Sequence, residues 1–342
     1  MSHKSTSRRR FVQGATGAAL APFFIRTASA DEGRKLSMGT VAPAVSVWAD
    51  IFNRYKKTVK KTSSEQLKIK AFWGGSRGGE LEMAQAVHAG RMDIFAGSMA
   101  ALASVVPELE AYELPFLFSN AKEAKKALLG TKKQLAGLLE KRGLVLLLLA
   151  ENGFRSMGFG PNGSAADPVD GLKGMKMRSM EAQCYVDMWK ALGASPQPIP
   201  VTETLQALQT GVVDGYDNTS VFAFAAAWNV ATSKFVYTEH AYQPGIVVMS
   251  KKVWNKLSKE EQQAMDPFRD EIAKVEDRGF RLVWAMGPQL RANWTQAGSK
   301  VEDLDPEARK KLAKKTQKVH GKFKSRTTKD GRALLQAVEK LI

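Results

Sequence analysis

The chain has 342 residues, of which 44% are apolar and 25% are charged, and these proportions exclude a protein that is disordered throughout. Its single cysteine excludes a disulfide framework and any cysteine-rich metal centre. The four histidines lie far apart in the sequence, so no multi-histidine metal site is expected. The length suffices for one large domain or two medium-sized domains, and the 51 basic and 34 acidic residues give a formal net charge of +17.

The first 30 residues have the features of an export signal. Three arginines at positions 8–10 precede a mildly apolar run at 14–25, and a small-x-small cleavage site ends at Ala30. The run has 12 residues, fewer than the roughly 20 that a membrane-spanning helix requires. Paired arginines before Phe11 are typical of a twin-arginine signal, whereas the alternative is a disordered basic tail. We therefore expect a periplasmic protein, exported by the twin-arginine route, that does not span the membrane and has a mature charge near +12.

Predicted strands and helices alternate through the next part of the chain. Apolar residues at 48, 51, 52, 55 and 59 recur at helical spacing, whereas those at 67, 69, 71 and 73 alternate as in a strand. The apolar run 144–150 indicates a buried strand. This alternation predicts a mostly parallel sheet with helices on both faces. Strands are expected at residues 35–40, 66–73, 93–96, 144–150 and 173–178, and helices at 48–59, 80–89 and 182–192.

The last part of the chain is predicted to be helical and basic. Ser258 and Glu261 form a capping box, and the helical pattern then runs to about Gly298, broken only around Gly287-Pro288. Such a helix is longer than usual in globular proteins, so it would reach across the molecule with a bend at the proline. The basic segment 309–332 is interpreted as a solvated face.

Two clusters of residues suggest chemistry but have simpler interpretations. Residues 74–79 form a glycine-rich turn that could present backbone N–H groups to an anion. They lack the Lys-Ser/Thr ending of a phosphate loop, so a plain tight turn is favoured. Asp214, Asp217 and Asn218 could support acid–base chemistry. No histidine lies near them in the sequence to complete a hydrolytic set, so a turn rich in glycine and capping residues is favoured.

Two arginines stand at the ends of predicted strands. Arg178 ends the strand at 173–178, and Arg155 follows the buried strand at 144–150. In open parallel sheets ligands bind beyond the carboxyl ends of the strands, and an arginine there can hold a carboxylate through two parallel hydrogen bonds. Two such arginines would suit an organic acid. From the residues alone, however, surface arginines are the favoured interpretation.

Four segments occur in an order that points to one family. They are 74–83 with 90–93, then 113–118, then 170–178, and finally 192–194 followed by 203–215. Through these segments, between about residues 34 and 300, the chain resembles the solute-binding proteins of tripartite ATP-independent periplasmic (TRAP) transporters, of the DctP type. The basic tail lies outside the resemblance.

The resemblance implies an α/β, two-lobe periplasmic binding protein fold (type II-like), with crossing strands and a long helix that spans both lobes. Residues 31–153 and about 241–283 are expected in lobe I, and residues 154–240 and about 284–342 in lobe II. A cleft between them closes on one small organic acid, which is delivered to the TRAP permease subunits in the membrane. We expect a monomer without enzyme activity or cofactor that does not bind nucleic acid.

The resemblance also assigns roles to single residues. Arg178 stands where the family's carboxylate-binding arginine stands, and Arg155 matches a second arginine of some members. Asn218 falls where an asparagine contacts the ligand in members that bind sialic acid. Asp217, which replaces a commoner glutamate, is likewise expected to contact the ligand. The pair Asp217-Asn218 differs from the Glu-Trp of members that bind an oxoacid through a metal, so no metal is expected.

Three further residues concern the ligand. Gly97 lies where binders of sialic acid carry a glutamate, which argues against that sugar. Ser98 beside it is expected to contact the ligand. Trp73, at a strand end, is expected either to stack on the ligand or to belong to the core.

Other functions remain as alternatives. A sensory protein that presents its bound ligand to a signalling receptor would have the same sequence features. An exported enzyme acting on a carboxylate is disfavoured because no nucleophile set is evident. A polyanion binder would explain the positive charge, but aromatic residues are not interleaved with the basic runs. The positive potential can instead steer an anionic ligand to the cleft.

Overall fold

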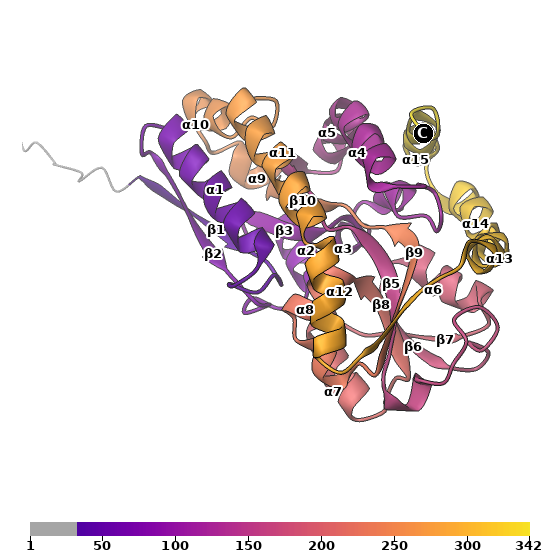
Figure 1. The fold of residues 1–342 in the computed structure, drawn as a ribbon. Helices are drawn as coiled ribbons and strands as arrows, with labels where there is room; N and C mark the ends of the chain where they lie inside the picture. The colour runs from indigo at the N-terminus through magenta and orange to yellow at the C-terminus, as the bar shows by residue number, and fades with distance from the viewer. Residues whose placement is uncertain (1–32) are drawn as a thin grey trace, which may run out of the picture. The chain divides into compact units, whose positions relative to one another are not determined.

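The computed structural model describes residues 33–342, so the expected export signal, residues 1–30, lies outside the described part. Two β-sheets organise the described chain, and helices flank them (Figure 1). The first sheet has the order β2 (Leu67–Phe72), β1 (Arg34–Gly39), β3 (Ile94–Ser98), β10 (Gly245–Ser250) and β4 (Leu144–Ala150). The second has the order β11 (Lys300–Asp303), β9 (Lys234–Tyr242), β5 (Phe154–Phe159), β8 (Gly215–Thr219), β6 (Lys176–Ser179) and β7 (Ser195–Pro198).

Each sheet is parallel apart from one strand. β10 runs antiparallel to β3 and β4, and β5 runs antiparallel to β8 and β9. The other paired strands run parallel. The predicted parallel pairing is therefore present, but it is divided between two sheets, as a two-lobe fold requires.

The antiparallel strand of each sheet follows a crossing from one sheet to the other. The chain passes from β4 to β5 through residues 151–153 and returns from β9 to β10 through residues 243–244. The crossings lie side by side, because Phe154 is paired with Tyr242 and Gly245 with Ala150. Two short connections thus join the sheets, an arrangement that suits hinge motion of two lobes.

Helices connect the strands and cover the sheets, and none within residues 33–342 is both long enough and apolar enough to span a membrane. Those before β9 are α1 (Val47–Thr62), α2 (Glu80–Ala89), α3 (Met99–Leu102), α4 (Ala121–Gly130), α5 (Lys132–Lys141), α6 (Gln183–Ala191), α7 (Thr204–Gln209) and α8 (Ser220–Ala225). Those after β10 are α9 (Lys251–Trp254), α10 (Lys259–Ala264), α11 (Asp270–Ala285), α12 (Gly287–Gln296), α13 (Pro306–Thr316), α14 (Lys318–Arg326) and α15 (Lys329–Glu339). Short 3-10 helices are η1 (Pro107–Tyr112), η2 (Pro161–Gly163), η3 (Val201–Glu203) and η4 (Trp228–Ala231).

The predicted long helix consists of three segments. α10 begins at the predicted capping box, in which the Glu261 N–H donates to Ser258 Oγ at 3.1 Å and the Ser258 N–H donates to Glu261 Oε2 at 2.8 Å. The prediction of unbroken helix through residues 265–269 was wrong. Pro267 has no backbone N–H and disfavours the helical conformation for the residue before it, so the helix stops there. The next break, between α11 and α12 at Met286, lies where a bend was predicted.

α11 and α12 together reach from one sheet to the other. α11 packs on α1 and β4, whereas α12 packs on α8 and β11. Figure 1 shows the pair, in orange, running along both halves of the molecule. The predicted helix that spans both lobes is therefore present as two consecutive helices.

The basic C-terminal segment is more than a solvated face. Its apolar side chains, among them Leu312, Val319 and Phe323, are buried. α13 and α14 contact α6, whereas α15 contacts η1, α4 and α5. The predicted lobe boundaries stay a prediction, and they would assign α15 to lobe II although these contacts are with helices that precede the first crossing.

Candidate functional site

Two adjoining cavities lie between the sheets, beside the crossings. The space within them, including the part that is open to solvent, is about 350 Å³ for the first and about 270 Å³ for the second. Glu80, Ser98, Asn152 and Phe222 line both cavities, which therefore form one cleft. Because α2 and β3 supply Glu80 and Ser98 from one side and α8 supplies Phe222 from the other, the cleft lies between the two lobes.

Arg178 reaches the cleft from β6. Its side chain is fully buried, and Nε donates to the carbonyl oxygen of Ile199 at 2.9 Å. The Nη1 and Nη2 atoms are also buried, but neither has a hydrogen-bond partner in the described chain. Buried polar groups are almost always paired, and leaving a charged one unpaired is costly. Two free donors on one guanidinium therefore indicate a site for a planar anion.

The guanidinium of Arg178 keeps its charge. Burial, together with the like charge of Arg155, lowers the pKa of Arg178 to about 10. The carboxylates of Glu181, Asp217 and Glu80 act in the opposite direction. Because this pKa is well above neutral, Arg178 presents a positive charge to the cleft at physiological pH.

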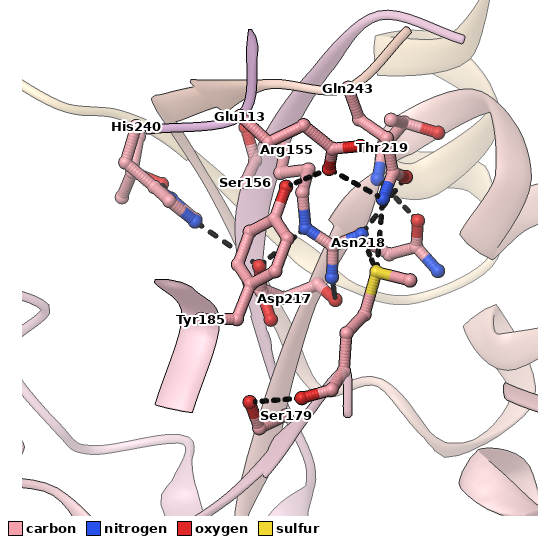
Figure 2. A network of polar contacts seen from close by, with 12 residues as sticks. Glu113, Arg155, Ser156, Ser179, Tyr185, Asp217, Asn218, Thr219, His240 and Gln243 are labelled. Carbon is pink, nitrogen blue, oxygen red and sulfur yellow. Dashed lines mark hydrogen bonds and ion pairs between the residues drawn. The ribbon is translucent and has the colours of Figure 1, made fainter. Parts of the chain in front are cut away.

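Arg155 also lines the cleft, but its donors are engaged within the protein (Figure 2). Nε donates to Asp217 Oδ2 at 2.5 Å, Nη2 to the carbonyl oxygen of Asp217 at 2.5 Å, and Nη1 to Gln243 Oε1 at 2.9 Å. Burial alone would raise the pKa of Asp217, but Arg155 and a hydrogen bond with His240 hold it well below its usual range. The charge of Arg155 is therefore compensated by a buried carboxylate.

Glu113 completes this network (Figure 2). Its Oε2 accepts from the Tyr185 hydroxyl at 2.6 Å and from Gln243 Nε2 at 3.3 Å. Burial raises the pKa of Glu113 to about 8, so the group is largely protonated at neutral pH. Because Glu113 follows η1 and Tyr185 lies on α6, their hydrogen bond connects segments on either side of the first crossing.

Glu80, the first residue of α2, presents a carboxylate to the cleft. Oε1 accepts from the Ser98 N–H at 2.8 Å, and Oε2 accepts from the Ser98 hydroxyl at 2.8 Å. One accepted bond on each oxygen suits the ionised form, although burial raises the pKa of Glu80. Gly97 provides the space, because a Cβ there would overlap Oε1 of Glu80.

Asn218 and Trp73 differ in their relation to the cleft. Asn218 lines the second cavity, and its Oδ1 accepts from the Thr219 N–H at 2.7 Å. Its amide nitrogen is thus available to a ligand. Trp73 lines neither cavity. It stacks on Phe52, with ring centroids 6.2 Å apart, and Phe52 lines the first cavity.

Comparison with known proteins decides the family. Residues 38–326 match the bacterial extracellular solute-binding proteins, family 7, also called DctP. The chain belongs to this family. It is 31% identical over 211 residues to a solute-binding protein of Verminephrobacter eiseniae, an alignment that covers 61% of this chain and 62% of that relative. It is 29% identical to the 2,3-diketo-L-gulonate-binding periplasmic protein YiaO of Escherichia coli, over 75% of this chain and 77% of that protein.

Solved structures of TRAP periplasmic solute-binding proteins share the two-lobe fold of this DctP-family chain, which confirms the predicted fold class. One from Bradyrhizobium, in complex with D-galacturonate, is 27% identical and has a TM-score of 0.81, over 90% of this chain and 100% of that one. The family match also extends beyond the predicted limit near residue 300 and includes α13 and α14.

The structure of this family member brings Arg155, Arg178, Asn218 and Ser98 to one cleft. Asp217 lies behind Arg155, outside the cleft lining.

The interpretation of both arginines as surface groups was wrong, because both are fully buried. The interpretation of the aspartate cluster as a turn was also wrong for Asp217 and Asn218, whereas Asp214 lies before the strand, in the turn region that follows α7. Residues 215–219 form β8, between β5 and β6, where burial of Asp217 is possible because Arg155 compensates it. That these side chains bind a ligand stays a prediction.

Sequence reasoning missed other residues of the cleft. Acidic residues are common in the first turn of a helix, because they interact favourably with the positive end of the helix dipole. Glu80 begins a helix, so its position did not mark it as a residue of the cleft. Phe222 belongs to an apolar run typical of any core. Gln243 and Asn152 lie in the crossings, where isolated amides follow no periodic pattern. The feature that could have identified these two amides is their position, because each lies in a connection between strands that belong to different sheets.

Proposed function

We propose that this DctP-family protein is the periplasmic receptor of a TRAP transporter, which captures a small organic acid and delivers it to the membrane permease. The observation that carries this proposal is the pair of buried, unpartnered Nη atoms of Arg178. A carboxylate matches them with two parallel N–H···O bonds. The compounds named for the relatives, 2,3-diketo-L-gulonate and galacturonate, are carboxylic acids, which supports this assignment.

Each predicted site residue has a part in this proposal. Arg178 binds the carboxylate, and Asn218 donates its amide to the same group. Ser98 contributes by holding Glu80 at the cleft wall. Arg155 and Asp217 fix the floor of the second cavity from behind, and Trp73 supports the wall residue Phe52.

Binding energy has more than one source. A charge-assisted hydrogen bond contributes about 1.5–3 kcal/mol. Micromolar affinity requires about 8 kcal/mol, so the arginine alone is insufficient. Closure of the two lobes on the ligand supplies the rest, because it buries the apolar walls of the cleft and removes the ion pair from water.

Location and delivery complete the proposal. The twin-arginine pattern at positions 8–10 supports export to the periplasm. There the protein binds its ligand without chemical change and passes it to the permease, so the function is transport rather than catalysis.

Native mass spectrometry of protein freshly purified from the periplasm tests ligand binding. The parent is expected to carry a co-purified small acid, and Arg178→Gln is expected to lose it while remaining folded. Arg91→Gln, at an exposed arginine, is the matched control and should retain it. Retention of the acid by Arg178→Gln at the parent's level would contradict the proposal.

Delivery needs a second measurement. Uptake of the same acid into vesicles that contain the cognate permease should require the added parent protein and fail with Arg178→Gln. Tight binding without any stimulation of uptake would favour the sensory alternative.

A further inference from the structure

The charges around the cleft favour a ligand with a single carboxylate. Among the described residues that line it, the charged side chains are Arg155, Arg178 and Glu80. Arg155 is paired with Asp217 at 2.5 Å, so Arg178 is the lining cation whose donors remain for a ligand. A second carboxylate would therefore find no cation with free donors in this lining.

Glu80 makes a second carboxylate unfavourable. It lines both cavities, so a ligand that extends from Arg178 into the first cavity lies against its carboxylate. Ser98 donates to both oxygens of Glu80 at 2.8 Å, and these bonds hold the carboxylate at the wall. Like charges forced together in a desolvated site strongly disfavour binding.

The first cavity offers apolar contacts. Two of its side-chain donors are already engaged within the protein, since Trp48 Nε1 donates to the Glu151 carbonyl oxygen at 3.0 Å and Asn152 Nδ2 donates to Gln243 Oε1 at 2.8 Å. A ligand rich in hydroxyl groups would lose hydrogen bonds to water where it lies against the apolar walls of this cavity. The apolar walls are formed by Val41, Ala42, Trp48, Phe52, Ala150 and Phe222.

We propose that the cleft selects a monocarboxylic acid with an apolar aliphatic or aromatic body, over dicarboxylic and polyhydroxylated acids. This inference rests on the proposed function, because Arg178 holds the carboxylate in both. Glu80 is the specificity-determining residue against a second carboxylate, and Phe52 and Phe222 disfavour hydroxyl groups. The preferred ligand thus differs in class from the galacturonate bound to the Bradyrhizobium protein.

Isothermal titration calorimetry at neutral pH tests the order of preference. The probes are isovalerate and phenylacetate as apolar monocarboxylates, succinate as a dicarboxylate and D-gluconate as a polyhydroxylated acid. We expect at least one apolar acid to bind about tenfold more tightly than succinate and gluconate, a difference of about 1.4 kcal/mol. Succinate or gluconate binding as tightly as the apolar acids would overturn the inference.

The two proposals fail in different ways. If an acid binds through Arg178 but in the wrong order, or if only an acid of another class co-purifies, this inference is wrong and the proposed function stands. If the parent binds none of the probes and carries no co-purified acid, both are wrong.

The variant Glu80→Gln tests the role of the carboxylate. The amide is of similar size and still accepts one hydrogen bond from Ser98, but it removes the charge. We expect the preference for isovalerate over succinate to fall about tenfold. Glu203→Gln, at an exposed acid of η3 beside the cleft residue Val201, should leave the preference unchanged. An unchanged preference in Glu80→Gln, with a melting temperature near the parent's, would rule out this role.

Discussion

Arg155 donates hydrogen bonds to both the side chain and the backbone of Asp217, with Nε 2.5 Å from Oδ2 and Nη2 2.5 Å from the carbonyl oxygen. This pairing separates the roles of two buried arginines that stand on strands of the same sheet. Arg155 is neutralised inside the protein, whereas the Nη atoms of Arg178 remain without a partner. In the proposed function, the ligand's carboxylate would compensate the charge of Arg178 as Asp217 compensates that of Arg155.

Removing Arg155 should destabilise the fold. In Arg155→Gln the carboxylate of Asp217 stays buried without its cation, and breaking a buried pair in this way costs about 3–5 kcal/mol. The free energy of unfolding from urea denaturation should fall by that amount. The double variant Arg155→Gln with Asp217→Asn should recover part of it. Lys310→Gln, which breaks an exposed pair with Glu307, is the control and should change stability by no more than about 0.5 kcal/mol. Equal effects of the buried and exposed substitutions would contradict this account.

Replacing Arg178 by lysine tests whether ligand binding needs only a positive charge or also the planar geometry of the guanidinium. Arg178→Lys keeps a positive charge but cannot form two parallel hydrogen bonds to one carboxylate. Loss of one charge-assisted bond, about 1.5–3 kcal/mol, corresponds to an affinity about 10- to 150-fold lower for the co-purified acid. Calorimetric titration measures it directly. Affinity equal to the parent's would show that a point charge suffices and that the planar guanidinium is not used.

Local sequence patterns predicted some elements of the fold closely. The apolar run at 144–150 is β4 with the same bounds, and the helix predicted at 80–89 is α2 with the same bounds. The break before α11 was missed because apolar residues keep helical spacing on both sides of Pro267. A single proline then outweighs the periodic pattern, because it removes a backbone donor and restricts Asp266.

The site was harder to predict from the sequence than the fold, because its contacts join residues that are far apart in the chain. Arg155 and Asp217 are 62 positions apart, and no periodicity links them. A central strand that contains Gly215, Asp217 and Asn218 also departs from the usual apolar composition, which is why a turn was favoured. The family resemblance, rather than the spacing of residues, indicated that Arg178 belongs to a ligand site.

The buried carboxyl of Glu113 should make stability fall as the pH rises. Burial raises the pKa of Glu113 to about 8, above the value of about 4.3 expected in the unfolded chain. Between these values the folded protein binds a proton that the unfolded chain has lost, so the free energy of unfolding decreases by about 1.4 kcal/mol per pH unit. Glu113→Gln keeps an acceptor for the Tyr185 hydroxyl and removes the titration. Urea denaturation between pH 5 and 8.5 should show a slope less steep in this variant than in the parent, whereas identical slopes would mean that Glu113 titrates normally.

Arg326 should contribute to stability because its ion pairs join α14 to both α6 and η1. It lies on α14, and its Nη1 donates to Asp187 Oδ2 on α6 at 3.1 Å while its Nη2 contacts Glu110 on η1. The two carboxylates are nearly buried, but the arginine side chain is 31% exposed, so solvent screening reduces the value of the pairs. We expect Arg326→Gln to lower the free energy of unfolding by about 1 kcal/mol, because Glu110 keeps the N–H of Gln183 and Asp187 keeps Lys322. Lys318→Gln, at an exposed lysine of the same helix, is the control. A loss no larger than the control's would show that apolar contacts, such as those of buried Phe323, attach α14 without help from the ion pairs.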